Sequence, residues 1–399
     1  MPALTALLLN IAHALDHLFL LIFATAVGAI AADFGFARWE DLMPFTAGAF
    51  FMFGLGSVPA GRLGDLWGRR RMMLVFFHGM GLSAIAVALT TNAWQMAAAL
   101  TVLGAFSAIY HPVGIPMLVQ RSTTPGRAIG INGLSGNLGI AVAALTTGFL
   151  VQHFGWRAAF AVPGLVSIVL GLWFARVAPA EGAAPARKPV GAVRVLPRAL
   201  AVRVFVVMVA SATTGSLLFN LTTNGNAQLL AERMDGIVAD PARLGLLLAA
   251  VYAVASVAQV VVGRLVDRMA LKPLFLGILA AQVLLFAAAA QASGWLWYAL
   301  AIGCMVSVFG SIPFNDFMVV RYVDDSMRSR VAGTRIAISF TISSAAVLLL
   351  GPAVKAAGFT VLLAALAAVA LASLLIVAWL PGERQLSAAW AEGAEADGR

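Results

Sequence analysis

The sequence predicts an all-α membrane protein with twelve transmembrane helices, arranged as two pseudo-symmetric six-helix bundles. The first observation is composition, because 61% of the 399 residues are hydrophobic and only 11% are charged, against roughly 25% charged in soluble domains. The second is that the apolar runs are long and continuous, which favours helices over the alternating strands of a transmembrane β-barrel. The third is an internal repeat, in which two short patterns recur about 200 residues apart.

The composition also excludes several classes of protein. A soluble enzyme of this size needs more polar surface than 26 Lys and Arg and 17 Asp and Glu can provide. The same low charge excludes a disordered chain, since disorder needs few apolar residues and many charges. The net charge of +9 would suit nucleic acid, but the basic residues concentrate in loops between apolar segments. We therefore interpret the charge as a topology signal and expect no nucleic-acid partner.

Each predicted span is an apolar segment of about the 20 residues that a helix needs to cross a bilayer. In chain order the candidate spans are 5–32, 42–62, 72–91, 94–119, 128–152, 156–176, 203–230, 243–263, 272–292, 295–320, 331–355 and 358–380. Short loops separate most of them, so consecutive helices should be antiparallel neighbours.

One connection is longer than the others and divides the chain. Residues 177–202 are rich in Ala, Pro and Arg, which is typical of a flexible linker. We expect an N-terminal six-helix bundle at 1–176, a cytoplasmic linker at 177–202, a C-terminal six-helix bundle at 203–380 and a cytoplasmic tail at 381–399.

The distribution of Lys and Arg predicts the orientation in the membrane. Most basic residues fall in or beside loops that are cytoplasmic if both termini are cytoplasmic, among them the run 69–71 and several positions in the linker. We therefore expect a multi-pass protein of the cell (inner) membrane with both termini in the cytoplasm.

The loop after the second span carries the most distinctive motif. Residues 61–71 have the sequence GRLGDLWGRRR, and the end of the eighth span repeats it as GRLVDR at 263–268. A second pair, RAIG at 127–130 and RVAG at 330–333, opens the fifth and eleventh spans. Glycines permit a tight turn and close helix approach, and a carboxylate at a helix end can accept charge-assisted hydrogen bonds.

The GRLGDLWGRRR loop resembles the signature loop of the major facilitator superfamily, and the span count, linker and repeat agree with that family. The resemblance implies a latch between the two halves, so the gating residues we expect here are Gly61, Asp65, Gly68, Arg69 and Arg70. An alternative for the arginines is that they only set the topology.

Two stretches in the fourth and fifth spans carry a finer resemblance. AIYHPVG at 108–114 and GNLGIA at 136–141 are similar to segments of the fosmidomycin-resistance-like efflux group. The Gly-Pro pair of the antiporter form is absent, as is the arginine of many drug antiporters, and His111 lies nearby instead. The resemblance implies export of a small organic molecule.

Polar residues inside the first span are the leading candidates for function. Asn10, His13 and His17 share one face, Asp16 lies on the adjoining flank, and an ionisable group at this depth is costly unless paired or hydrated. Since histidine titrates near physiological pH, we interpret them as a proton site and part of the substrate wall. The alternatives are a structural hydrogen-bond network, or a metal site formed by His13, Asp16 and His17, which we do not favour.

Three other spans contribute candidates. Pro112 should kink the fourth span, so that Tyr110 and His111 face an aqueous cavity. Asn137 lies in the glycine motif of the fifth span. In the seventh span, Asn220 and Asn224 share one face at a spacing of four residues, which favours substrate contact over helix–helix hydrogen bonding.

A charged pair is predicted at the cytoplasmic side of the tenth and eleventh spans. Asp316 and Arg335 should lie at similar depth on consecutive antiparallel helices, which makes a salt bridge plausible. It would act as a gate, or it would only neutralise two costly charges.

Together these features favour a secondary active transporter that moves a small organic or drug-like solute by alternating access, with proton coupling and efflux. The alternatives are proton-linked uptake of a small polar metabolite or organic anion and, more remotely, transport of a metal or metal chelate. No phosphate-binding loop or nucleophile motif indicates an enzyme. We expect no cofactor and no resident metal, with the solute, protons and lipid as partners of a monomer.

Overall fold

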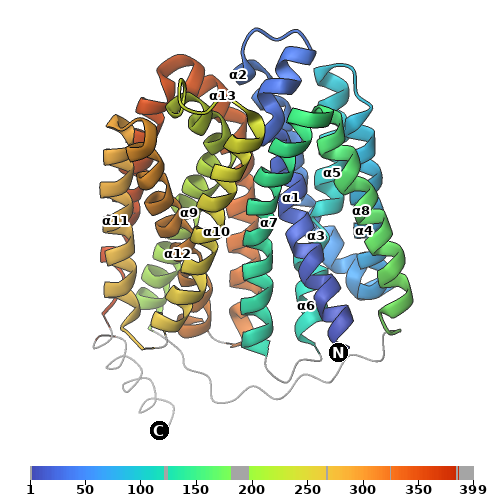
Figure 1. Ribbon diagram of the computed structural model, residues 1–399. Helices are drawn as coiled ribbons and strands as arrows, with labels where there is room; N and C mark the ends of the chain where they lie inside the picture. Colours follow the sequence, from blue (N-terminus) through green and yellow to red (C-terminus); the bar gives the residue numbers. More distant parts are fainter. Residues whose placement is uncertain are drawn as a thin grey trace, which may run out of the picture.

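The computed structural model describes residues 2–120, 125–180, 197–266, 268–323, 325–382 and 385. Within these ranges the side chains of 125, 126, 316, 320, 325–337 and 340 lie outside the description. The described chain is helical throughout and forms one bundle (Figure 1). Its helices of the first half are α1 (Ala3–Asp33), α2 (Trp39–Leu42), η1 (Met43–Thr46), α3 (Ala47–Trp67), α4 (Arg69–Ala88), α5 (Ala93–Ser107), η2 (Tyr110–Gly114), α6 (Ile115–Val119), α7 (Pro125–Phe154) and α8 (Trp156–Val177).

The second half repeats this helical arrangement after the linker region. Its helices are α9 (Arg198–Arg233), α10 (Pro241–Val266), α11 (Leu271–Gln291), α12 (Gly294–Tyr322) and α13 (Asp325–Ala378). The bundle boundaries predicted at 176 and 203 lie close to the end of α8 and the start of α9. The assignment of these segments as separate domains stays a prediction, and most of the linker and tail lie outside the described residues.

Eleven described helical segments are long and apolar enough to cross a membrane, one fewer than the twelve spans expected. The difference arises in α13, which has 54 residues and contains Gly358 with a φ of 76°. A left-handed backbone of this kind is one that glycine adopts at little cost. One long element therefore covers both of the last two predicted spans.

Contacts with α9 show that the chain reverses at Gly358. Before it, Ser343 bonds Ser216 in the middle of α9. After it, Thr360 bonds Arg233 at the end of α9, Ser373 bonds Thr214, and Trp379 bonds Arg203 near its start. The two parts of α13 thus pass α9 in opposite directions, as separate eleventh and twelfth spans would.

The two halves meet closely on the side where α2 lies. Helices α7 and α10 cross tightly at Gly148 and Gly245. A Cβ added at Gly148 would lie 2.5 Å from the Pro241 oxygen, and one added at Gly245 would lie 2.5 Å from the Ala144 oxygen. On the same side Lys355 pairs with Asp41 at 2.5 Å, and the rings of Trp39 and Phe359 stack 6.0 Å apart. These contacts close the bundle on the α2 side.

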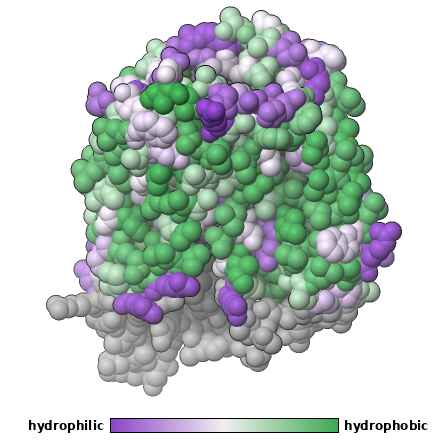
Figure 2. Space-filling view, viewed as in Figure 1, coloured by the Kyte–Doolittle hydropathy of each residue, from purple (hydrophilic) through white to green (hydrophobic). Residues whose placement is uncertain are grey.

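The opposite side of the bundle carries the start of α1, the end of α8 and the start of α9 (Figure 1). On the face that Figure 2 shows, a wide apolar band crosses the molecule, with hydrophilic residues above and below it and a furrow at its lower edge. If both termini lie in the cytoplasm, as the basic loops predict, this arrangement would be an inward-facing state.

Candidate functional site

Asp16 lies at the centre of a buried polar cluster between α1, α5 and η2. Its side chain is fully buried, and the Ser107 hydroxyl donates a short hydrogen bond to Oδ1. The second oxygen, Oδ2, has no hydrogen-bond partner among the described residues, but it lies 3.5 Å from His111 Nε2. A carboxylate at this depth needs such partners, because apolar surroundings do not solvate a charge.

His13 is held in a defined orientation one turn before His17. Its Nδ1 lies 2.7 Å from the backbone oxygen of Asn132 in α7. Since a carbonyl oxygen only accepts hydrogen bonds, Nδ1 carries the proton and Nε2 of the neutral ring keeps its lone pair. His17 Nε2 lies 3.2 Å from this atom and can donate to it.

Three imidazole rings converge at this point. The ring of His111 stands edge-on to those of His13 and His17, with centroids 5.1 Å and 5.9 Å away. One nitrogen from each of the three histidines lies within 4.8 Å of the others, so these residues could hold a metal ion. The structure therefore brings His13 and His17 of α1 together with His111 of η2, two segments that were considered separately from the sequence.

Glycines of the fifth-span motif make room for this arrangement. A Cβ added at Gly136 of α7 would lie 2.6 Å from Cε1 of His13, and one at Gly139 would lie 2.2 Å from the backbone oxygen of Ala14. The motif thus permits α7 to pack directly on α1, as close helix approach through small residues requires.

Around Pro112 the fourth span changes to a π-helical turn, η2, from Tyr110 to Gly114. Proline lacks an N–H and disrupts the regular ladder, and π-turns of this kind are frequent at functional sites. The two residues expected to face a cavity differ here. The His111 side chain is 29% exposed, whereas Tyr110 is fully buried and stacks on the His13 ring at 4.7 Å.

Asn132 is a site residue that the sequence analysis missed. Its Nδ2 donates to Asn10 Oδ1 at 2.9 Å and to the Tyr110 hydroxyl at 2.6 Å, and that hydroxyl donates to the Leu9 oxygen at 2.8 Å. The available signal was an amide about one helical turn before Gly136, on the same face of the predicted fifth span. Asn10 and Tyr110 therefore belong to the hydrogen-bonded wall of the cluster.

Asn137 links the first half of the chain to the second. Its Nδ2 donates a short hydrogen bond to Gln259 Oε1 of α10, and Gln259 also lies opposite Gly133, one turn earlier in α7. Asn137 directly follows Gly136, which touches His13. The polar cluster consequently lies next to the place where the two halves meet at mid-depth, and Gln259 is a second residue that the sequence analysis missed.

The polar face of α9 is engaged with α13 rather than with the histidines. Asn220 donates to the Ser216 oxygen at 2.9 Å and to Ser343 Oγ at 2.8 Å. Asn224 donates to the Asn220 oxygen at 3.0 Å, and its own Oδ1 has no partner among the described residues. A role of these two amides in substrate contact stays a prediction.

The predicted latch region shows local packing on the linker side. Gly68 has a φ of 93° between α3 and α4, and Arg70 bonds the Ala175 and Ala178 oxygens at the end of α8. Such cation-to-carbonyl contacts satisfy the last acceptors of a helix. Arg70 thus ties α4 to α8 within the first half.

The other residues predicted to act in gating have different surroundings. A Cβ at Gly61 would touch Pro112 of η2 at 3.4 Å, and Arg69 bonds Gln120 at 3.0 Å. Asp65 is exposed and makes no ion pair with any described side chain. The side chains of Asp316 and Arg335 lie outside the described part of the structure, so their salt bridge stays a prediction.

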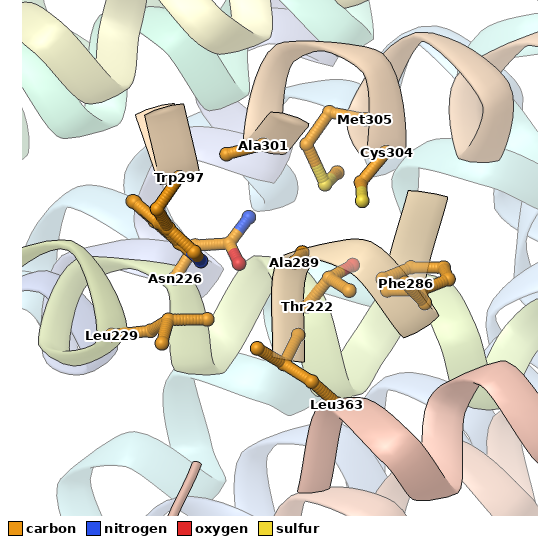
Figure 3. A pocket seen from close by; sticks show the side chains of 10 residues that line it. All are labelled: Thr222, Asn226, Leu229, Phe286, Ala289, Trp297, Ala301, Cys304, Met305 and Leu363. Atoms are coloured by element: carbon orange, nitrogen blue, oxygen red, sulfur yellow. The ribbon is translucent and has the colours of Figure 1, made fainter. Parts of the chain in front are cut away.

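A small pocket lies within the second half, between α9, α11, α12 and α13 (Figure 3). Its lining is mostly apolar, with the amide of Asn226 and the indole of Trp297, whose Nε1 has no hydrogen-bond partner among the described residues. Its volume of about 10 Å³ matches the space that one water molecule needs. This pocket is too small for an organic solute.

Comparison with known proteins gives matches over much of the chain. The family model described as Major Facilitator Superfamily matches residues 9–231, which is more than half of the chain. The tetracenomycin C resistance and export protein of Streptomyces glaucescens is 33% identical over 170 residues, or 41% of this chain and 31% of that protein. The 4-hydroxybenzoate transporter PcaK of Pseudomonas aeruginosa is 28% identical over 148 residues, or 36% of this chain and 32% of that protein.

Each of these matches spans only about a third of the relative's own length. Among solved structures, the inward-open xylose transporter XylE from E. coli superposes with a TM-score of 0.78 at 12% identity, covering 96% of this chain and 99% of that one. This likeness shows the fold.

Proposed function

The chain belongs to the major facilitator superfamily, and we propose that it is a proton-coupled secondary active transporter that exports a small organic or drug-like solute. Alternating access would move the solute, with the two halves rocking about a central site. The observation that carries the proposal is the buried cluster of His13, Asp16, His17 and His111. These ionisable side chains lie inside predicted membrane spans, next to the Asn137–Gln259 contact between the two halves.

Export is supported by two kinds of resemblance. One relative, matched over 41% of the chain, is named for tetracenomycin C resistance and export. The segments 108–114 and 136–141 resemble the fosmidomycin-resistance-like efflux group, and the structure gives both a place in the cluster, as the π-turn that holds His111 and the glycines that seat His13.

Proton-linked uptake is the second candidate. A relative matched over a similar share of the chain is named as a 4-hydroxybenzoate transporter, so a small organic anion is its substrate class. Histidines and amides in the cluster and at Gln259 would suit a polar anion, because each can donate a hydrogen bond.

The proposed location is the cell membrane with both termini in the cytoplasm. Reporter fusions after Arg198 and at the C-terminus should both report cytoplasm. A periplasmic signal at either position would reverse the orientation, and the state closed on the α2 side would then be outward-facing.

Vesicle transport separates the candidate functions. A thermal-shift screen of purified protein against metabolites and drugs would first supply a ligand, because binding to the native state raises its stability. An exporter that exchanges protons should accumulate that ligand in inside-out vesicles with an acidic interior. A symporter for uptake should accumulate it in right-side-out vesicles with an acidic exterior. Equal flux with and without a protonophore would contradict proton coupling.

A further inference from the structure

We infer that His13, His17 and His111 form a binding site for a divalent transition-metal ion, with Asp16 as its anionic partner. This inference goes beyond the proposed function and does not depend on it. The three rings come from α1 and η2, and their donor nitrogens lie within 4.8 Å of one another.

The spacing of the first two nitrogens fits a coordination sphere. His13 Nε2 and His17 Nε2 are 3.2 Å apart. Two nitrogens bound to one zinc ion at about 2.0–2.1 Å in a tetrahedron would be about 3.3 Å apart. The nitrogen of His111 is the outlying one, and a turn of its partly exposed side chain toward α1 would complete a three-imidazole face.

The surroundings of His13 match those of a metal ligand. Its Nδ1 donates to the Asn132 oxygen, which fixes the tautomer and leaves Nε2 available as a ligand atom. Metal-bound histidines almost always donate their second ring nitrogen to a carbonyl, a carboxylate or water in this way. Gly136 supports the arrangement, since a side chain there would collide with the ring.

Charge balance is provided by Asp16. A divalent ion bound to three neutral imidazoles would bring two positive charges into a buried region, which is costly without a counter-charge. The Asp16 carboxylate is buried, lies 3.5 Å from His111 Nε2 and has no hydrogen bond at Oδ2 from the described residues. It can serve as the neutralising charge.

The ligand types indicate which ions the site would take. Imidazole suits Zn²⁺, Cu²⁺, Ni²⁺ and related ions, whereas Mg²⁺ and Ca²⁺ prefer sites made of oxygen atoms. The ion could arrive as the free hydrated ion, or within an organic chelate that leaves coordination positions open. In both cases the three imidazoles bind the metal ion itself.

Cobalt is the best probe, because Co²⁺ bound to few ligands absorbs visible light far more strongly than the hydrated ion. The full chain should be purified in detergent without a polyhistidine tag, freed of metal with a chelator, and titrated with Co²⁺. We expect strong visible bands that saturate near one ion per chain and disappear when Zn²⁺ is added. A spectrum identical to that of hydrated Co²⁺ would overturn the proposal.

Variants assign the bands to the cluster. His13→Gln, His17→Gln and His111→Gln should each abolish them, whereas His153→Gln, at an exposed position in α7, should leave them unchanged. Gly136→Ala should weaken Co²⁺ binding about 10–100-fold by displacing the His13 ring, as loss of a supporting contact does. Equal loss in the His153 variant would contradict the assignment.

Two further measurements test whether the variant is folded and whether the ion binds alone or within a chelate. Zn²⁺ should raise the melting temperature of the parent but not of His17→Gln, which must itself unfold cooperatively to count as folded. Co²⁺ presented as its iminodiacetate complex distinguishes the sources, because retention of labelled iminodiacetate indicates recognition of a chelate and its release indicates the free ion. Binding without proton-driven flux would contradict only the proposed function.

Discussion

The two halves of the bundle use different chemistry at the same depth. In the first half, α1 and η2 bring three histidines and one aspartate together. In the second half, the corresponding polar face of α9 consists of amides and hydroxyls, and its described contacts join Asn220 to Ser216 and Ser343. Neutral groups of this kind cost less inside a membrane than charges do. On the proposed function, this difference predicts that the first half carries the ion and that the second half contributes shape and hydrogen bonding.

The largest expected effect is therefore on ion coupling. Asp16→Asn keeps the side-chain shape but removes its charge, so it should abolish accumulation driven by a pH gradient and leave substrate binding measurable. Moving one charge across 100 mV is worth about 2.3 kcal/mol, and a carrier without a group that loads the proton cannot use this energy. Gradient-driven uptake into vesicles with a chelator present, compared with equilibrium binding, measures both quantities.

Asn220→Ala is the matched control in the second half. It should lower substrate affinity and leave gradient-driven accumulation intact. If Asp16→Asn accumulates substrate as well as the parent does, the proton is carried elsewhere, with His111 the next residue to test, and the proposed division between the halves is wrong.

The second prediction concerns Asp316 and Arg335, the charged pair that is predicted within the second half. Asp316→Asn and Arg335→Gln should each slow transport about tenfold, because an unpaired charge at a helix interface is strongly unfavourable. The exchange Asp316→Arg with Arg335→Asp should recover part of the rate. A double variant as poor as the product of the single effects would show that the two residues are not partners.

Much of this architecture was predictable because apolar length and the repeat are properties of the chain itself. The helices and the polar stripe of α1 follow from local sequence, whereas the close packing at Gly136 and Gly139 emerged only from the structure. Ser107, Asn132 and Gln259 were missed because each acquires meaning only from a helix distant in sequence. The last predicted span begins at residue 358, whereas the structure has helix on both sides of Gly358 and one element, α13, that continues through it.

The third prediction tests the contact that joins the two halves on the α2 side. Gly148→Ala would place a Cβ 2.5 Å from the Pro241 oxygen, so α7 and α10 must separate. Over-packing of this kind costs about 1–3 kcal/mol. We expect a lower melting temperature in detergent and a longer distance between spin labels on the α2-side ends of these two helices.

Gly277→Ala in α11 provides the comparison, since nothing lies within 4 Å of a Cβ at that position. It should be neutral or slightly stabilising, because alanine favours the helix over glycine. Equal destabilisation by both substitutions would mean that the α7–α10 crossing is not the contact that holds this side closed.

The smallest expected effect compares the hydrogen bonds of the two regions directly. Tyr110→Phe removes a hydroxyl that bonds two other helices, because it accepts from Asn132 of α7 and donates to the Leu9 oxygen of α1. Asn132 keeps its bond to Asn10. Asn220→Ala removes one bond to another helix, the one to Ser343, and one bond within α9, to the Ser216 oxygen. The Ser343 hydroxyl still bonds Ser216 and the Ser339 oxygen. Hydrogen bonds between membrane helices average about 0.6 kcal/mol and reach about 1.7 kcal/mol. Tyr110→Phe should therefore lie near the upper value and Asn220→Ala near or below the mean, as measured by reversible unfolding in mixed micelles. The opposite order would show that the second half, not the histidine cluster, is the more rigidly bonded region.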